Sequence, residues 1–151
     1  MTDEAIAAIE YEALVLSRHL AGLPGRTRRS GGVLDNSAYT LLSILEAGGS
    51  TTIGSLSTTT GLDTSTLNRQ TAALVRDGYA SRVPDPEGGL ARKFHITPQG
   101  QDLLREEQEA SRSALESITD DWPPADRQAL ARLLTRFNQA IEYRSGRTWP
   151  R

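Results

Sequence analysis

The residues from 64 to 77 place hydrogen-bonding side chains at regular intervals. Positions three or four apart share one side of a 3.6-residue period, and that side carries Ser65, Asn68, Arg69, Ala72 and Arg76. Hydroxyl, amide and guanidinium groups are donors and acceptors that contact base edges and phosphates in the DNA major groove. Leu67, Thr71, Leu74 and Val75 mark a different face. The segment predicts an amphipathic helix with a polar face suited to duplex DNA; an ordinary capped surface helix is the alternative interpretation.

The start of this helix adds two further candidates. Thr64 and Thr66 stand where the backbone N–H groups and the helix dipole favour anions. We therefore expect both threonines to reach phosphates.

A shorter helix precedes this segment and is joined to it by a turn. It is predicted to begin near Thr52 and to end at Gly61, which suits a left-handed C-terminal cap. Asp63 then suits the N-cap of the next helix, which ends at Gly78. Two helices joined by a glycine-containing turn of about three residues form a helix-turn-helix unit.

Beyond Gly78 the hydrophobic period changes from that of a helix to that of a strand. The stretches "YASRVP" and "LARKFHIT" flank the turn-rich "DPEGG", which predicts a β-hairpin, or wing. A helix-turn-helix followed by a wing is much more specific than either part alone.

Four longer helices are predicted around this unit. One covers residues 4–20, one runs from Asp35 or Ser37 to Gly48, and one spans 98–119 behind Thr97 as N-cap. The last, over 124–145, carries a narrow apolar stripe. The expected fold class is mainly α with a small β-hairpin wing: a winged helix-turn-helix core over about 35–97, with further helices over about 3–21 and 98–145.

Composition narrows the functional classes. The 151 residues suit one domain, and the absence of cysteine excludes disulfides, thiolate metal sites and a cysteine nucleophile. No signal peptide and no membrane span are evident, so we expect a soluble cytoplasmic protein. His19 and His95 are far apart with no acid at ligand spacing, so neither a metal nor another cofactor is expected. Nothing suggests a nucleophile–base pair, and the chain is not expected to be an enzyme.

The stretch "TIGSLSTTTGLDTSTLNRQTAALVRDGYASRVPDPEGG…ITPQG" resembles the winged helix-turn-helix of the MarR family of bacterial transcriptional regulators. The likeness covers about residues 35–120 by motif and 1–151, as a single domain, by length and helix order. The family pattern is matched at Ser65, Thr66, Arg69, Leu74, Gly78, Arg82, Asp85, Pro86, Thr97 and Gly100. The resemblance implies a homodimer built from the first, fifth and sixth helices. It also implies a pseudo-palindromic double-stranded DNA operator, and often a small aromatic or phenolic ligand.

The predicted wing departs from that pattern. The family usually has Asp-x-Arg seven to nine residues before the threonine of the next helix, and here those places hold Gly88 and Leu90. Arg92 and Lys93 follow and are the candidates to contact the minor groove instead. The alternative interpretation, equally supported, is that Arg92 is a strand residue that forms a salt bridge.

Two further sets complete the expectations. The dimer interface is expected to include Ile6, Ile9, Leu130, Leu133, Leu134 and Phe137. Tyr11, Arg18 and Tyr39 are candidates for a ligand pocket, because pockets collect aromatics around one charge; interhelical packing is the alternative.

The sequence therefore predicts a DNA-binding transcriptional regulator, a homodimeric repressor released by a small ligand. The competing hypothesis is a winged-helix module that binds protein and has weakened DNA binding. The near balance of five bases and four acids over residues 51–100 and the missing wing arginine support that second hypothesis.

Overall fold

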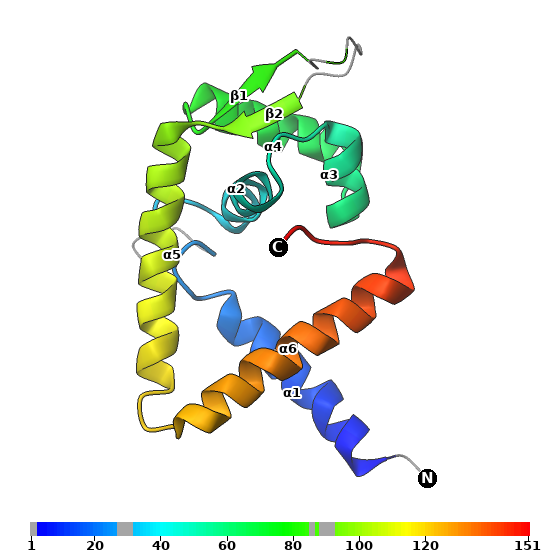
Figure 1. Ribbon diagram of the computed structural model, residues 1–151, viewed down its shortest axis with the longest axis vertical. Coiled ribbons are helices and arrows are strands. Elements are labelled where there is room, and N and C mark those ends of the chain that lie inside the picture. Colours follow the sequence, from blue (N-terminus) through cyan, green and yellow to red (C-terminus); the bar gives the residue numbers. More distant parts are fainter. Residues whose placement is uncertain (1–2, 27–31, 85–86, 88–92) are drawn as a thin grey trace.

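A computed structural model of the chain describes residues 3–26, 32–84, 87 and 93–151. Its elements, in chain order, are α1 (Glu4–Leu20), α2 (Asn36–Gly48), α3 (Ile53–Thr60), α4 (Thr64–Arg76), β1 (Ala80–Val83), β2 (Lys93–Ile96), α5 (Pro98–Ile118) and α6 (Pro124–Ser145) (Figure 1). The mainly helical class with a two-stranded wing is confirmed, and helix ends agree with the predicted ones to within one or two residues.

Local capping explains why four of these helices begin where they do. The side chains of Asp35, Thr52, Asp63 and Thr97 each accept a hydrogen bond from the backbone N–H three residues further on, at 2.7–3.1 Å. Each bond satisfies one of the N–H groups that the first helical turn leaves unpaired. The α3–α4 turn closes on Gly61, whose φ of 74° lies in the left-handed region that favours glycine.

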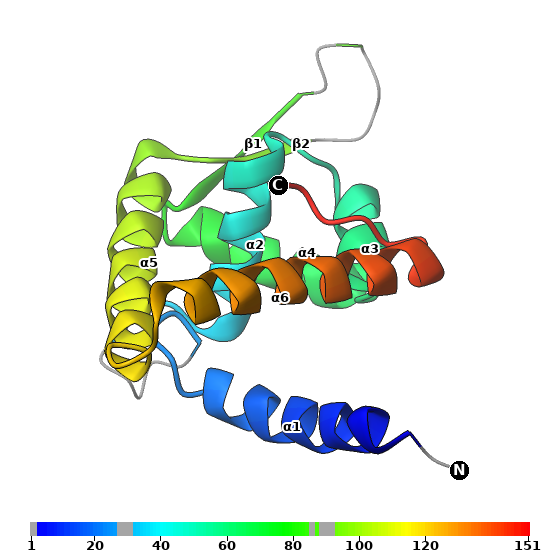
Figure 2. The same ribbon diagram turned by 60° about the horizontal axis from the view of Figure 1, so that its bottom comes forward.

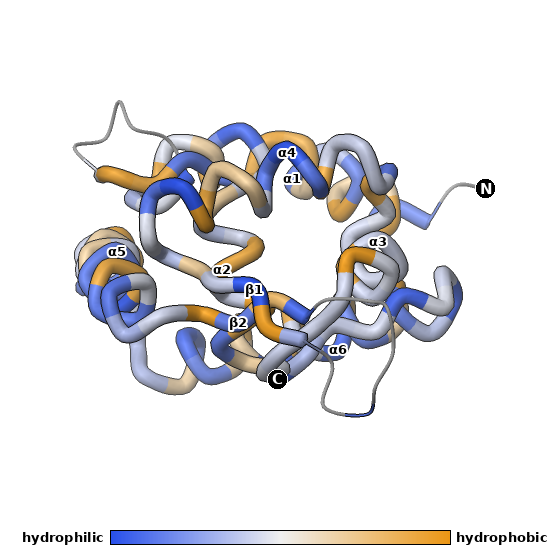
Figure 3. The backbone as a smooth tube through the Cα atoms, turned by 90° about the horizontal axis from the view of Figure 1, so that it is seen from above, coloured by the Kyte–Doolittle hydropathy of each residue, from blue (hydrophilic) through white to orange (hydrophobic). Residues whose placement is uncertain are grey.

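The apolar core lies where α2, α3, α4 and the hairpin meet the first turns of α5. We call this body the winged-helix lobe. Its buried apolar residues are Leu34, Leu41, Leu42, Ile44, Leu45, Leu56, Leu67, Leu74, Ala80, Phe94 and Leu104. Seen from above, α5 and α3 lie on opposite sides of the hairpin (Figure 3).

The wing is joined to the lobe along the backbone. β1 and β2 pair antiparallel, with Ser81 opposite His95 and Arg82 opposite Phe94. On its other side Phe94 exchanges two hydrogen bonds with Thr51, in the connection between α2 and α3, at 2.8 and 3.0 Å. The α2–α3 connection therefore adds a one-residue bridge to the hairpin, a long-range pairing that the sequence pattern does not indicate.

α5 leads away from the lobe, and α1 and α6 lie at the end of the molecule remote from the wing (Figures 1 and 2). Neither α1 nor α6 has a buried residue. Both nevertheless carry large apolar side chains. Among the residues that the structure describes, no helix combines the length and the apolar character needed to cross a membrane.

Candidate nucleic-acid interface

α4 presents the polar face that the sequence predicts. Its exposed residues include the five of the predicted face, namely Ser65, Asn68, Arg69, Ala72 and Arg76. On the opposite face Leu67, Thr71 and Leu74 are buried. The hydroxyl of Thr71 donates to the Leu67 carbonyl oxygen at 2.7 Å, so it is buried without leaving a polar group unpaired. The hydrogen-bonding face of α4 is thus held outward by apolar anchors from the same helix.

The carboxylate of Asp63 holds the first turn of α4. Ser65 Oγ donates to it at 2.6 Å, the Thr66 backbone N–H at 2.7 Å, and Thr66 Oγ1 at 3.0 Å. These three bonds, the one from Ser65 contributing most, together with the charge of Arg69, lower the pKa of Asp63 to about 2. The carboxylate is therefore ionised at neutral pH.

A phosphate contact would require the hydroxyls of Ser65 and Thr66 to direct their protons toward solvent. In the structure they do not. Each hydroxyl has one proton, and both protons are donated to Asp63. The same hydroxyls keep lone pairs that can accept from the amino groups of cytosine or adenine. A phosphate contact would require the hydroxyl to rotate away from Asp63. An acidic N-cap followed by Ser at the second position and Thr at the third was the sequence signal for this arrangement.

The cations of α4 differ in their surroundings. Arg69 is exposed, and one of its five N–H donors lies 3.4 Å from Thr66 Oγ1. Arg76 Nε lies 3.3 Å from the carboxylate of Asp77, in a pair exposed to solvent. Exposed pairs of this kind contribute little energy and exchange readily. Arg69 is therefore the α4 cation best placed to contact DNA together with Ser65 and Asn68. Thr64, the candidate for a phosphate contact, is exposed at the start of the helix.

Of the two wing candidates, Arg92 lies outside the described residues, as do Gly88 and Leu90. Lys93 opens β2 and pairs with Val83 across the hairpin. Phe94 is buried, so alternation places Lys93 and His95 on the other face of the strand. There His95 Nε2 lies 2.7 Å from Ser81 Oγ. The guanidinium carbon of Arg82 lies 5.4 Å from the centre of the Phe94 ring, within the range of a cation–π contact.

The three ligand candidates are not brought together in one described pocket. Tyr11 and Arg18 are exposed on α1, with Tyr11 61% accessible. Tyr39 is half-buried on α2, and the guanidinium carbon of Arg26 lies 4.1 Å from the centre of its ring. Tyr39 thus has a cationic neighbour that sequence reasoning missed, because Arg26 follows a loop whose path no periodicity predicts.

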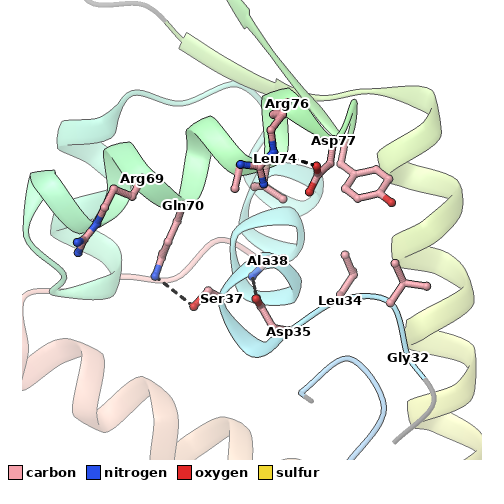
Figure 4. Close-up of a pocket in the computed structure, with 13 residues that line it drawn as sticks. Gly32, Leu34, Asp35, Ser37, Ala38, Arg69, Gln70, Leu74, Arg76 and Asp77 are labelled. Atoms are coloured by element: carbon pink, nitrogen blue, oxygen red, sulfur yellow. Dashed lines mark hydrogen bonds and ion pairs between the residues drawn. The ribbon is translucent and has the colours of Figure 1, made fainter. Parts of the chain in front are cut away.

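A pocket of about 560 Å³ opens beside α4 instead, and none of those three residues lines it. Figure 4 shows it between α4, the start of α2 and the residues that precede α2. Gln70 Nε2 reaches across it to Ser37 Oγ at 3.1 Å. The other amide atom, Gln70 Oε1, is buried and has no hydrogen-bond partner in the described part of the chain. Its lining includes Arg69 and Arg76 of the polar face of α4, so a molecule bound here would also contact these two side chains.

The six residues expected at a dimer interface are all solvent-accessible in the single chain. Their exposed fractions range from 40% to 57%, for Ile6, Ile9, Leu130, Leu133, Leu134 and Phe137. Further apolar residues on the same helices, among them Leu14 and Ile141, are exposed to a similar degree. Large apolar side chains that are exposed together on two helices are typical of an interaction site.

Comparisons with known proteins fit this geometry. The chain is 33% identical over 136 residues to the HTH-type transcriptional regulator YxaD of Bacillus subtilis (strain 168), a match that covers 90% of this chain and 94% of YxaD. No family model matches the chain.

Two solved structures share the fold over most of the chain. A MarR family protein from Bacillus stearothermophilus superposes with a TM-score of 0.81 at 20% identity, over 93% of this chain and 98% of that one. A point mutant of MarR from E. coli, solved in complex with operator DNA, superposes with a TM-score of 0.69 at 15% identity, over 90% and 99%. The resemblance to the MarR fold that the sequence indicated is confirmed.

Proposed function

The chain belongs to the HTH-type transcriptional regulators and has the MarR fold, and we propose that it binds a pseudo-palindromic duplex operator as a homodimer. The observation that carries this proposal is the outer face of α4. Ser65, Asn68 and Arg69 stand exposed on one stripe while Leu67 and Leu74 are buried beneath. A helix so presented fits the major groove, where a guanidinium reads guanine and an amide reads adenine.

The dimer part of the proposal is supported by α1 and α6. Neither helix buries a residue within its own chain, although both carry rows of apolar side chains. We assign these rows to a two-fold interface in which each chain covers the other, with the winged-helix lobes as separate DNA-reading units. Two-fold symmetry then requires two similar half-sites in the operator.

The test is binding of a duplex that contains the DNA upstream of the protein's own gene. We expect the apparent affinity to fall steeply with salt, because phosphate contacts release counterions. Arg69→Ala is expected to weaken binding, whereas Arg144→Ala, which removes an exposed arginine from the far end of α6, serves as the control. An affinity that is independent of salt, or equal for any duplex and for both variants, would contradict specific DNA reading.

A second candidate function is supported by the same first turn of α4. Since Ser65 and Thr66 give their protons to Asp63, an anionic carboxylate stands among the groups that would meet a phosphate. A module that binds a protein partner through this face would not need phosphate contacts. Binding of a protein partner that persists in high salt, together with no preference for operator DNA, would favour this alternative.

We further propose that a small aromatic effector releases the DNA and that the protein is a cytoplasmic repressor. Two sites are candidates for the effector. One includes Tyr11, Arg18 and Tyr39, and the other is the pocket beside α4, where Gln70 Oε1 has no hydrogen-bond partner among the described residues. Gln70→Ala and Tyr39→Ala separate them. Salicylate can serve as the probe, and the variant that abolishes its effect on DNA binding identifies the site.

A further inference from the structure

After α6 the chain reverses and returns to the winged-helix lobe. Gly146 ends the helix with a φ of 68°, and the residues that follow run back until they lie beside α2 (Figures 1 and 2). We call residues 147–151 the return segment. Extended chain without secondary structure would be free to leave the surface, so its contacts decide whether it has a role.

The return segment is fastened to α6 at Glu142. The Arg151 guanidinium contacts both carboxylate oxygens, with Nη1–Oε2 at 3.0 Å and Nη2–Oε1 at 2.5 Å. The backbone N–H of Trp149 donates to Oε2 of the same carboxylate at 3.1 Å. Glu142 is the less exposed partner, with 11% of its side chain accessible. A bidentate pair of this geometry is stronger and more directional than an ordinary surface ion pair.

The same segment touches the lobe at three points. Pro150 covers Gly48 at the end of α2 so closely that a Cβ on Gly48 would lie 3.0 Å from the Pro150 ring. Thr59 Oγ1 on α3 lies 3.5 Å from the Thr148 carbonyl oxygen. The Arg147 guanidinium occupies the space beside Gly61 that a Cβ there would need. Gly61 lies in the turn of the helix-turn-helix unit, two residues before Asp63, the N-cap of α4.

These contacts connect α6 to the α3–α4 turn of its own chain. α5 already links the lobe to α6 covalently, but a single helix fixes the distance between two bodies better than their relative rotation. A second attachment at another point removes that rotation. In a dimer that reads two half-sites, the rotation of each lobe sets the separation and angle of the two recognition helices.

We propose that the return segment is a brace: Arg151 and Glu142 hold it on α6, it holds the helix-turn-helix unit in a fixed orientation, and it thereby sets the half-site spacing of the operator. This inference rests on the proposed dimeric, DNA-binding function. Glu142, Arg151 and Trp149 act as positioning residues, because their effect on DNA passes through the orientation of α4.

The experiment compares Arg151→Gln with Arg144→Gln. Both remove one exposed arginine, but Arg144 stands on α6 and contributes nothing to the Glu142 bonds described above. An operator is first selected from random duplexes with the wild-type protein. It is then remade with its centre one or two base pairs longer or shorter, and as an isolated half-site.

For wild type and Arg144→Gln we expect affinity to drop sharply when the spacing changes. Arg151→Gln is expected to lose about tenfold on the selected spacing, in line with the loss of a bidentate charged pair, and to lose less on the altered ones. Its affinity for the isolated half-site should equal that of Arg144→Gln. Arg151→Lys keeps the charge without the fork and should lie between the two.

The fluorescence of Trp149 provides a measurement that does not depend on DNA. In a Trp122→Phe background, where Trp149 is the remaining tryptophan, its emission should shift to longer wavelength in Arg151→Gln and stay in place in Arg144→Gln. If the wild type selects no operator, the proposed function fails, while the fluorescence still shows whether Arg151 holds the return segment on the lobe. If Arg151→Gln shifts the emission or the melting temperature but keeps the wild-type preference for spacing, the segment only packs on the lobe, and the brace is refuted.

Discussion

The winged-helix lobe and the two helices α1 and α6 contain similar amounts of helix, but they differ in how far they bury their apolar side chains. The lobe buries leucines from four helices around Phe94, while α1 and α6 together bury none of their residues. α4 and α6 both carry apolar side chains on one face. What differs is that the face of α4 meets α2 and the hairpin, whereas that of α6 faces solvent in the single chain.

The comparison teaches that an amphipathic pattern predicts a covered face without predicting what covers it. For α4 the cover is provided by the same chain. For α1 and α6 we propose a second copy. The two regions should therefore respond differently to the same substitution, and their response to protein concentration should separate them.

The largest effect is expected from Leu67→Ala in the lobe. Leu67 is completely buried, and loss of such a leucine typically lowers the free energy of unfolding by about 2–5 kcal/mol. Leu133→Ala on α6 makes the same chemical change at a half-exposed position. In denaturant titrations at several protein concentrations, the cost of Leu67→Ala should be constant, and that of Leu133→Ala should vary with concentration. If the destabilisation by both variants depended on protein concentration in the same way, the apolar faces of α4 and α6 would not differ in what covers them.

The next effect concerns association itself. Phe137→Asp places a charge in the apolar row of α6 and should raise the dimer dissociation constant by about 100-fold or more, because an unpaired buried charge costs several kcal/mol. Tyr143→Asp is the control, since Tyr143 is 91% exposed on the same helix. Sedimentation of both variants at micromolar concentration gives the answer. A Phe137→Asp protein that stays dimeric would place the interface elsewhere.

A smaller effect is expected on the outer face of the lobe. Arg69→Ala should weaken operator binding by about 1–3 kcal/mol, and it should leave thermal unfolding almost unchanged because the side chain is exposed. Binding is measured by titration of a labelled duplex, and folding by circular dichroism. Unaltered affinity with intact folding would count against docking of α4 in the groove.

The smallest effect should come from Asp63. Its pKa falls from 3.8 unfolded to about 2 folded, so its ionised form stabilises the fold above about pH 4, and that contribution is lost as the pH falls toward 2. Asp63→Asn keeps a capping side chain but does not titrate. The wild type should melt above Asp63→Asn at pH 6, and the gap should narrow below pH 4. A gap that does not change with pH would show that the bonds to Ser65 and Thr66 do not depend on the charge.

Features that depend on neighbouring residues could be predicted from the sequence. The caps at Asp63 and Thr97 and the stop at Gly78 follow from rules that act within one helical turn. The buried face of α4 follows from its period. Each of these predictions is confirmed.

Contacts between distant residues could not be predicted in this way. The bridge from Thr51 to Phe94, the stacking of Arg26 on Tyr39 and the return segment on α3 join positions whose separation along the chain carries no periodic signal. The hydrogen bonds from Ser65 and Thr66 to Asp63 are local, but they were missed because Ser65 also suits a contact in the major groove and Thr66 a contact with a phosphate. Their roles at the interface remain predictions, as do those of Thr64 and Asn68.

The Thr51–Phe94 bridge has a consequence for the DNA. Its two hydrogen bonds join β2 to the connection that leads into α3, so we expect the paired strands and the helix-turn-helix unit to tilt together when they meet an irregular groove. When the protein does not deform, the strain of a poor fit is taken up by the duplex, and its energy depends on how easily each base step bends. We expect operators to be ranked in part by flexible pyrimidine–purine steps at positions that no side chain reaches. Replacing such a step by a stiff A-tract, with every contacted base kept, should weaken binding.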